Sequence, residues 1–128
     1  EDLSRGMQQK IAVARALFPS PSLLLLDEPT TGLDPVSKRQ VQDYVLRIRK
    51  RNNVTVLLTT HDMDEAERVC DRLSIIHHGR FIAVGTFEQI QQQADCAGGS
   101  LEEIFFQMTG TDLAHADLES ESSPGGGE

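Results

Sequence analysis

Apolar and polar residues along the first part of the chain predict a helix followed by a strand. Apolar side chains recur at helical spacing from Met7 to Phe18, and two prolines follow, so we expect a helix over residues 5–18. Ser4 stands where the N-cap of this helix is expected. The next apolar run, from Leu23 to Leu26, is short and continuous, which predicts a strand buried on both faces.

The following stretch contains a second helix and a second strand. Asp34 followed by Pro35 predicts a helix start, because an acidic N-cap before a proline at the first helical position is a strong start signal. The segment VTVLLTT, residues 54–60, is β-branched and apolar and predicts a second buried strand. His61 comes directly after it, and Asp62 can cap a short helix that runs to about Cys70.

The last part of the chain predicts a hairpin, two helices and a tail. The segment LSIIHHGRFIAVG, residues 73–85, reads as two strands around a turn at His78-Gly79. Capping patterns at Thr86 to Gln89 and at Ser100 to Glu103 each predict the start of a helix. Residues 111–128 are rich in acids and glycine and poor in large apolar side chains, which predicts a disordered acidic tail.

This order of strands and helices is typical of an α/β fold with a parallel sheet and flanking helices. In such sheets the residues that bind ligands collect at the carboxyl ends of the strands. Asp27 and Glu28 follow the first strand, and His61 follows the second. We therefore expect two acids and an imidazole to lie at one edge of the sheet.

The composition limits the size of the fold and the kind of partner. A chain of 128 residues suffices for one small domain. The net charge of −8 disfavours nucleic acid as a partner, because binding of the phosphate backbone needs an excess of Lys and Arg. No stretch approaches the roughly 20 apolar residues of a membrane span, and the two cysteines lack the spacing of a zinc site. These features predict a soluble, cytosolic chain.

The residues at the predicted sheet edge have complementary chemistry. Asp27 offers a hard oxygen ligand that suits Mg²⁺ shared with water and phosphate. Glu28 points elsewhere, because successive strand side chains diverge, and so could orient or deprotonate a water molecule. His61 could donate a hydrogen bond to a terminal phosphate. Together these groups suit nucleotide hydrolysis by positioning and electrostatics.

Four short motifs resemble those of the ABC-type ATPases. LSRGMQQ at 3–9 resembles the signature, LLLLDEP at 23–29 the Walker B strand, TGLD at 31–34 the D-loop, and His61 in TTHD the switch histidine. Their order and spacing also fit the family. The resemblance implies a partial P-loop NTPase of the RecA-like, ABC type. The segments GRFIAVGTFEQI and SLEEIFFQMTG further resemble the ATPase subunits of drug, lipid or polysaccharide exporters.

The resemblance also implies a role for each of these residues. Asp27 would belong to the Mg²⁺ shell, Glu28 would activate the attacking water, and His61 would sense the γ-phosphate of ATP. Asp34 would lie in the D-loop, at the interface with a second ATPase subunit.

The signature would complete an ATP site in that second subunit. Leu3, Ser4, Arg5, Gly6 and Met7 would close over the ATP held by the opposite subunit of a head-to-tail dimer, using the backbone and dipole of a helix N-terminus. Two of these positions depart from the family pattern. Arg5 replaces the usual glycine, so its side chain could crowd the phosphate or attract it, and Met7 stands where many members have glutamine.

The phosphate-binding loop of the family is absent, because no G-x-x-x-x-G-K-[ST] occurs in the sequence. In the family this loop lies upstream of the signature. We therefore interpret residues 1–110 as the C-terminal part of an ABC ATPase domain whose N-terminal half is missing. The intact protein is expected to be an ATPase, whereas this chain alone is expected to be inactive.

The resemblance finally implies a cofactor, partners and a location. ATP and Mg²⁺ would be bound, a second ATPase subunit and a transmembrane permease would be the partners, and the protein would lie on the cytoplasmic face of a membrane through that permease. Export is the implied direction of transport. Two alternatives stay open: a non-catalytic half-domain that regulates a complete ABC subunit, and part of an ABC ATPase that does not serve transport.

Overall fold

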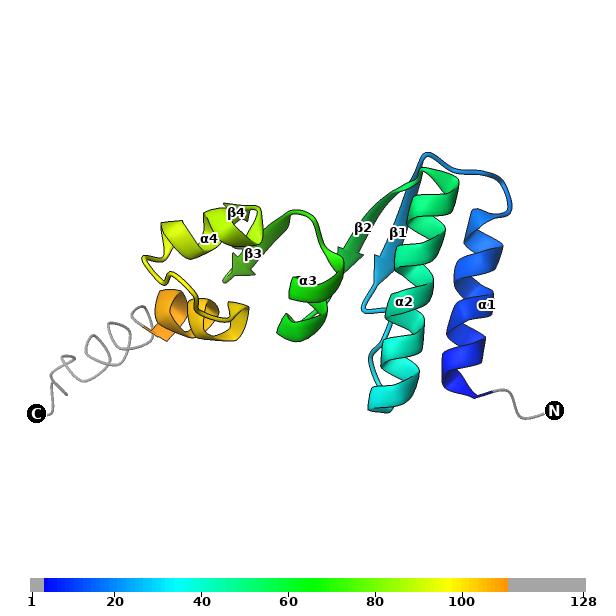
Figure 1. Cartoon of the computed structure of the whole chain (residues 1–128), viewed down its shortest axis with the longest axis horizontal. Helices are drawn as coiled ribbons and strands as arrows, with labels where there is room; N and C mark the ends of the chain where they lie inside the picture. The colour runs from blue at the N-terminus through cyan, green and yellow to red at the C-terminus, as the bar shows by residue number, and fades with distance from the viewer. Residues whose placement is uncertain (1–3, 111–128) are drawn as a thin grey trace, which may run out of the picture. The chain divides into compact units, whose positions relative to one another are not determined.

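The computed structural model of the chain describes residues 4–110, which form two compact units divided between Val69 and Cys70 (Figure 1). The first unit contains α1 (Arg5–Leu17), β1 (Leu23–Asp27), α2 (Pro35–Asn52), β2 (Thr55–Thr59) and α3 (Met63–Val69). The second unit contains β3 (Leu73–His77), β4 (Arg80–Gly85), α4 (Phe87–Gln93) and a helical segment at 101–110. The predicted tail at 111–128 lies outside the described residues.

The first unit is built around a parallel pair of strands, as the sequence predicts. Leu24 of β1 lies opposite Val56 of β2, and Asp27 lies opposite Thr59. Helices α1 and α2 lie side by side, and both begin at the end of the unit where β1 and β2 finish (Figure 1). The carboxyl ends of both strands and the N-termini of both helices therefore share one end of this unit.

The core of the first unit lies between the helices and one face of the strand pair. Its members are the apolar side chains that point from α1, α2 and the strands toward each other. They are Val13, Leu24, Leu26, Val41, Val45, Ile48 and Val54. Apolar residues on α2 recur three or four positions apart, so they form one stripe along the helix and bury it against the strands.

The prediction that both faces of the strands are buried is wrong for the described residues. Burial alternates along β1, and Leu23 and Leu25 are 51% and 65% exposed. Leu57 of β2 is 59% exposed. Successive strand residues point to opposite faces, and within residues 4–110 the helices of this unit cover only the face that carries Leu24 and Leu26. The opposite face is an exposed apolar surface.

Both long helices begin at the predicted caps. The Ser4 hydroxyl accepts a hydrogen bond from the Met7 backbone N–H at 3.1 Å, which satisfies a donor in the first turn of α1. At α2, the Asp34 carboxylate accepts hydrogen bonds from the backbone N–H groups of Val36 and Ser37, both at 3.1 Å. Helix α2 ends at Asn53, whose φ of 50° places it in the left-handed conformation common after helices.

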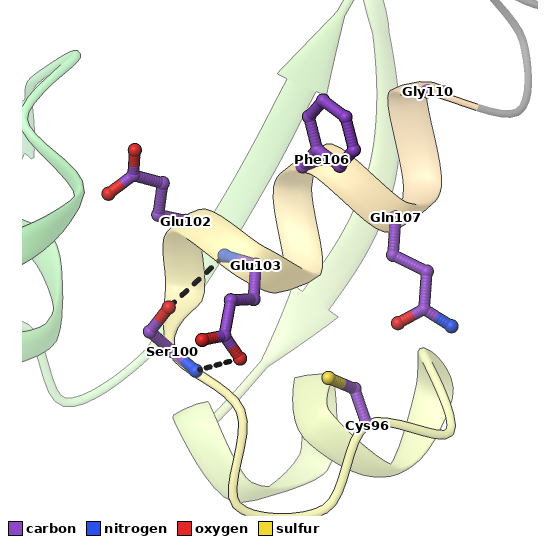
Figure 2. Close-up of a pocket in the computed structure, with 7 residues that line it drawn as sticks. All are labelled: Cys96, Ser100, Glu102, Glu103, Phe106, Gln107 and Gly110. Carbon is purple, nitrogen blue, oxygen red and sulfur yellow. Dashed lines mark hydrogen bonds between the residues drawn. The ribbon is translucent and has the colours of Figure 1, made fainter.

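The second unit confirms the predicted hairpin and capping patterns. Strands β3 and β4 are antiparallel around His78 and Gly79, and both turn residues have positive φ, as a tight hairpin turn requires. Thr86 and Gln89 form a capping box at α4. Ser100 and Glu103 exchange the same pair of hydrogen bonds at the helical segment 101–110 (Figure 2). Across residues 4–110, the helices are too short or too polar to span a lipid bilayer.

Candidate functional site

The predicted acids lie at the paired ends of β1 and β2. Asp27 closes β1 opposite Thr59, and its Oδ1 accepts a hydrogen bond from the Thr59 hydroxyl. The backbone N–H of Glu28 donates to the Thr59 carbonyl at 2.8 Å and so continues the pairing of the strands by one residue. The two acids are thus held at the carboxyl edge of the sheet, where ligand sites of parallel α/β folds occur.

Glu28 turns away from the strand direction. Its φ of 46° lies in the left-handed region, which is uncommon for a residue with a side chain. The chain reverses here, because the backbone N–H of Thr31 donates to the Glu28 carbonyl at 3.3 Å. This turn separates the directions of the two carboxylates and brings Glu28 toward the segment that follows β2.

His61 meets Glu28 across this edge. Its Nδ1 lies 2.7 Å from Oε1 of Glu28, and the side chains of His61 and Glu28 are 71% and 43% exposed. The hydrogen bond to Glu28, and then the charge of that carboxylate, raise the pKa of His61 above its ordinary value, because both favour the imidazolium. The predicted meeting of an acid and an imidazole at one sheet edge is therefore present in the geometry.

Replacing Glu28 with glutamine should return the pKa of His61 toward that of an ordinary histidine. The stabilisation from this pair is fully present below the ordinary histidine pKa of about 6.5 and is lost as the pH rises through the raised value. An NMR titration of the His61 ring measures the change. The exposed acid Asp64 provides the control, since Asp64→Asn removes a charge without removing this hydrogen bond. A His61 pKa that is the same in Glu28→Gln and the unmutated chain would contradict the pairing.

Asp27 has the donor chemistry of a Mg²⁺ ligand. Its Oδ1 is occupied by Thr59, whereas its Oδ2 has no hydrogen-bond partner among residues 4–110. In this same range no three His, Cys, Asp or Glu side chains converge as a metal-binding group. One open carboxylate oxygen fits an ion that keeps several waters and shares its remaining ligands with phosphates, as Mg²⁺ does.

The signature residues lie at the N-terminus of α1, at the same end of the unit. Gly6 is buried, and a β-carbon there would lie 3.1 Å from Cβ of Ser37, so glycine permits the close approach of α1 to the start of α2. The Arg5 guanidinium extends over the TGLD segment, since Nη1 lies 3.3 Å from where a β-carbon of Gly32 would be. Met7 is 50% exposed, and Leu3 lies outside the described residues.

Asp34 is placed by its role as the cap of α2. The Ser37 hydroxyl and the backbone N–H of Ser37 lower the pKa of the Asp34 carboxyl, because they bond to its charged form. Nearby, Lys38 donates to Asp62 at 2.7 Å, and this hydrogen bond lowers the pKa of Asp62 and raises that of Lys38. The contribution of Asp62 to stability is present above the ordinary Asp pKa and is lost as the pH falls through the lowered value.

Sequence reasoning missed a buried polar network behind this edge. Glu65 of α3 is 1% exposed, and it accepts hydrogen bonds from Thr30 at 2.6 Å and from Gln42 at 3.2 Å. A signal was available in the sequence: Glu65 stands four residues before the buried Val69 and therefore lies on the apolar face of its helix.

The second unit has an open hollow on its surface, which is separate from the edge that carries Asp27, Glu28 and His61. Figure 2 shows the residues that line it, which are Cys96, Ser100, Glu102, Glu103, Phe106, Gln107 and Gly110. None of them is a predicted site residue. Its charged lining groups are both acids, and like charge disfavours the phosphates of a nucleotide. We do not connect this hollow with nucleotide chemistry.

Comparison with known proteins shows which families and proteins this chain is similar to. The family described as "AAA domain, putative AbiEii toxin, Type IV TA system" matches residues 1–66. The Nod factor export ATP-binding protein I of Rhizobium johnstonii is 45% identical over 109 residues, covering 80% of this chain and 35% of that protein. The methionine import ATP-binding protein of Haemophilus ducreyi is 43% identical over 89 residues, covering 70% of this chain and 26% of that protein.

A solved structure has the same fold. The chain described as "Structure of ATP binding subunit of ABC transporter" is 35% identical with a TM-score of 0.68, covering 84% of this chain and 44% of that one. This likeness confirms the predicted α/β fold of an ABC-type ATPase. The chain spans between 24% and 38% of the length of the curated relatives it matches. It belongs to the AAA domain family whose model matches residues 1–66, and it is similar to the ATP-binding proteins of ABC transporters.

Proposed function

We propose that this chain forms part of an ABC transporter subunit that binds MgATP and hydrolyses it to drive export across a membrane. The observation that carries the proposal is the meeting of Glu28 and His61, 2.7 Å apart, beside the open carboxylate oxygen of Asp27. An acid, an imidazole and a metal-suited carboxylate at the carboxyl edge of a parallel sheet are the groups that nucleotide hydrolysis uses.

Each of these residues has a distinct role in the proposed reaction. Glu28 accepts a proton from the water whose oxygen attacks the γ-phosphorus, and the bond from that phosphorus to the ADP oxygen breaks. His61 donates a hydrogen bond to the γ-phosphate, and its Nδ1 contacts Glu28 at the sheet edge. Asp27 would hold Mg²⁺, which when bound neutralises charge on the phosphates.

The proposed site is completed by a second subunit. The N-terminus of α1, with Ser4 and Gly6, would face the ATP held by that subunit, since free backbone N–H groups and the helix dipole attract phosphate. Asp34 would lie at the same interface. The guanidinium of Arg5, which extends over Gly32, would add positive charge beside this interface.

The proposed partners also include a transmembrane permease, which would hold the subunit at the cytoplasmic face of the membrane. We propose export because the segments around β4 and the helical segment 101–110 resemble exporter subunits and because a Nod factor export protein is among the relatives. A methionine import protein is also among them. The exposed face around Leu25 and Leu57 would be covered by further chain of the complete ATPase.

Grafting the chain into a complete relative tests the proposal. In the chimera, residues 4–110 replace the aligned region of the Rhizobium johnstonii protein, which is 45% identical. We expect the chimera to release phosphate from MgATP and the isolated 128-residue chain to release none. Coupled phosphate release measures both. An inactive chimera that binds ATP would instead support the non-catalytic regulatory role, and turnover by the isolated chain would refute the need for an upstream phosphate loop.

A further inference from the structure

Glu65 is a charged residue in a buried position, and the proposed reaction does not use it. Its side chain is 1% exposed, and Oε1 accepts hydrogen bonds from the Thr30 hydroxyl at 2.6 Å and from the Gln42 amide at 3.2 Å. Its Oε2 is also buried and has no hydrogen-bond partner within residues 4–110. Burying a carboxylate is unfavourable unless it is hydrogen-bonded, so these contacts are needed to keep Glu65 inside the fold.

The surroundings of Glu65 fix its direction. Gln42 is 6% exposed, and its Oε1 accepts a hydrogen bond from Nη1 of Arg68 at 3.1 Å. The other nitrogen of that guanidinium, Nη2, bonds Asp43. Because Arg68 occupies the oxygen end of the Gln42 amide, the NH₂ end is directed at Glu65. Gln42 of α2 thereby directs a hydrogen bond at the Glu65 carboxylate of α3, and Thr30 donates a second one.

Thr30 lies in the turn that carries Glu28. It is 3% exposed and comes two residues after Glu28, and the backbone of the next residue, Thr31, closes the turn on the Glu28 carbonyl at 3.3 Å. A displacement of Thr30 therefore moves Glu28. The hydrogen bond between Thr30 and Glu65 joins this turn to α3 across 35 positions of sequence.

The backbone of Glu65 is tied to the segment that carries His61. Its N–H donates to Oδ1 of Asp62 at 3.2 Å, and the N–H of Asp62 donates to the Thr60 hydroxyl at 3.0 Å. Asp62 and Thr60 flank His61 in the chain. Glu65 thus contacts the turn of Glu28 through its side chain and the segment of His61 through its main chain.

The contact between Glu28 and His61 contributes little to fixing its own geometry. The His61 side chain is 71% exposed and that of Glu28 is 43% exposed, and exposed ion pairs contribute little because water competes for both partners. The bond between Thr30 and Glu65 is buried on both sides, where water is excluded. The buried contact is therefore the better candidate to set the distance between the two exposed groups.

We propose that Glu65 is a positioning residue: through its hydrogen bond with Thr30 it holds the turn of Glu28 in the position from which Glu28 contacts His61. It does not touch the reacting atoms. The inference rests on the proposed function only in treating Glu28 and His61 as groups that act on ATP. The positioning of Glu28 by Thr30 and Glu65 involves residues of this chain alone, and the pKa of His61 reports on it without any ATP turnover.

The most informative variant is Thr30→Val. It removes the hydroxyl donor while keeping the side-chain volume and the charge of the chain. It therefore breaks the hydrogen bond between Thr30 and Glu65, here called the tether, and leaves every electrostatic partner of His61 in the sequence. Those partners are Glu28, Asp62 and Lys38. We expect an NMR titration to show the pKa of His61 moving toward its ordinary value in Thr30→Val and staying raised in Thr30→Ser, which keeps the hydroxyl. In the chimera, Thr30→Val should lower kcat by about 10- to 100-fold with an unchanged KM for MgATP.

A purely structural role gives a different result. Thr30→Val would then lower the melting temperature and leave the His61 pKa and kcat as they are, which would overturn the proposal. If Thr30→Val unfolds the isolated chain, the chimera decides, because an unchanged KM shows a folded site and kcat then reports its geometry. An unmutated chimera without turnover would refute the proposed function, while the titration of His61 would still test the tether.

Discussion

Substituting glutamine for Glu28 in the chimera should lower its turnover of MgATP by about 10²- to 10⁴-fold, the usual contribution of a general base. Glutamine keeps the size of the side chain but carries no charge. It cannot take the proton of the attacking water, because an amide oxygen is far less basic than a carboxylate. Phosphate release at saturating MgATP measures the loss of kcat.

Two controls separate lost chemistry from lost binding. The KM for MgATP should change little in Glu28→Gln, since a group that acts in the transition state affects kcat more than ground-state binding. Asp64→Asn, an exposed acid of α3 outside the site, should keep the turnover of the unmutated chimera. If Glu28→Gln retains more than about a tenth of the turnover, Glu28 is not the base.

Replacing Leu24 with alanine should destabilise the first unit severely, by about 2–5 kcal/mol, which is the usual range for a large-to-small change in a core. Leu24 is 3% exposed and lies in the core between β1 and the helices. Removing its side chain loses burial and leaves a cavity that the neighbouring valines cannot fill. Urea unfolding followed by circular dichroism measures the change in the free energy of unfolding.

The neighbouring Leu25 is the matched control. It has the same side chain in the same strand, but it is 65% exposed on the opposite face. Leu25→Ala should cost less than about 1 kcal/mol, as surface substitutions usually do. Equal destabilisation by the two variants would mean that the face of Leu25 is buried in solution, and a dependence of stability on protein concentration would then identify self-association as the cause.

The sequence predicted most of the secondary structure because the signals for it are local. Ser4 and Asp34 are capping residues next to apolar periodicity, and a cap needs only backbone groups within three residues. The capping boxes at Thr86 and Ser100 and the turn at His78 depend on similarly short-range contacts. Such contacts can be predicted without knowledge of the rest of the fold.

The candidate site was predicted in part for the same reason. Asp27 and Glu28 follow one strand, and His61 follows the next. Because the two strands pair in parallel, all three residues lie at one edge of the sheet. The left-handed turn at Glu28 and its contact with His61 were not predictable from residue types. They depend on where the backbone of Thr59 and the buried Thr30 lie in the folded chain.

The sequence by itself determined the order of helices and strands, the parallel pairing of two strands and the residues at their ends, because periodicity, caps and strand ends are read over a few positions. Only the tertiary structure decided which strand face is buried, which explains why Leu24 is enclosed and Leu25 exposed despite identical side chains. It also decided the partners of Glu65, which come from segments 23 and 35 positions away. Contacts at that separation depend on how helices and loops pack, and short-range patterns carry no information about it.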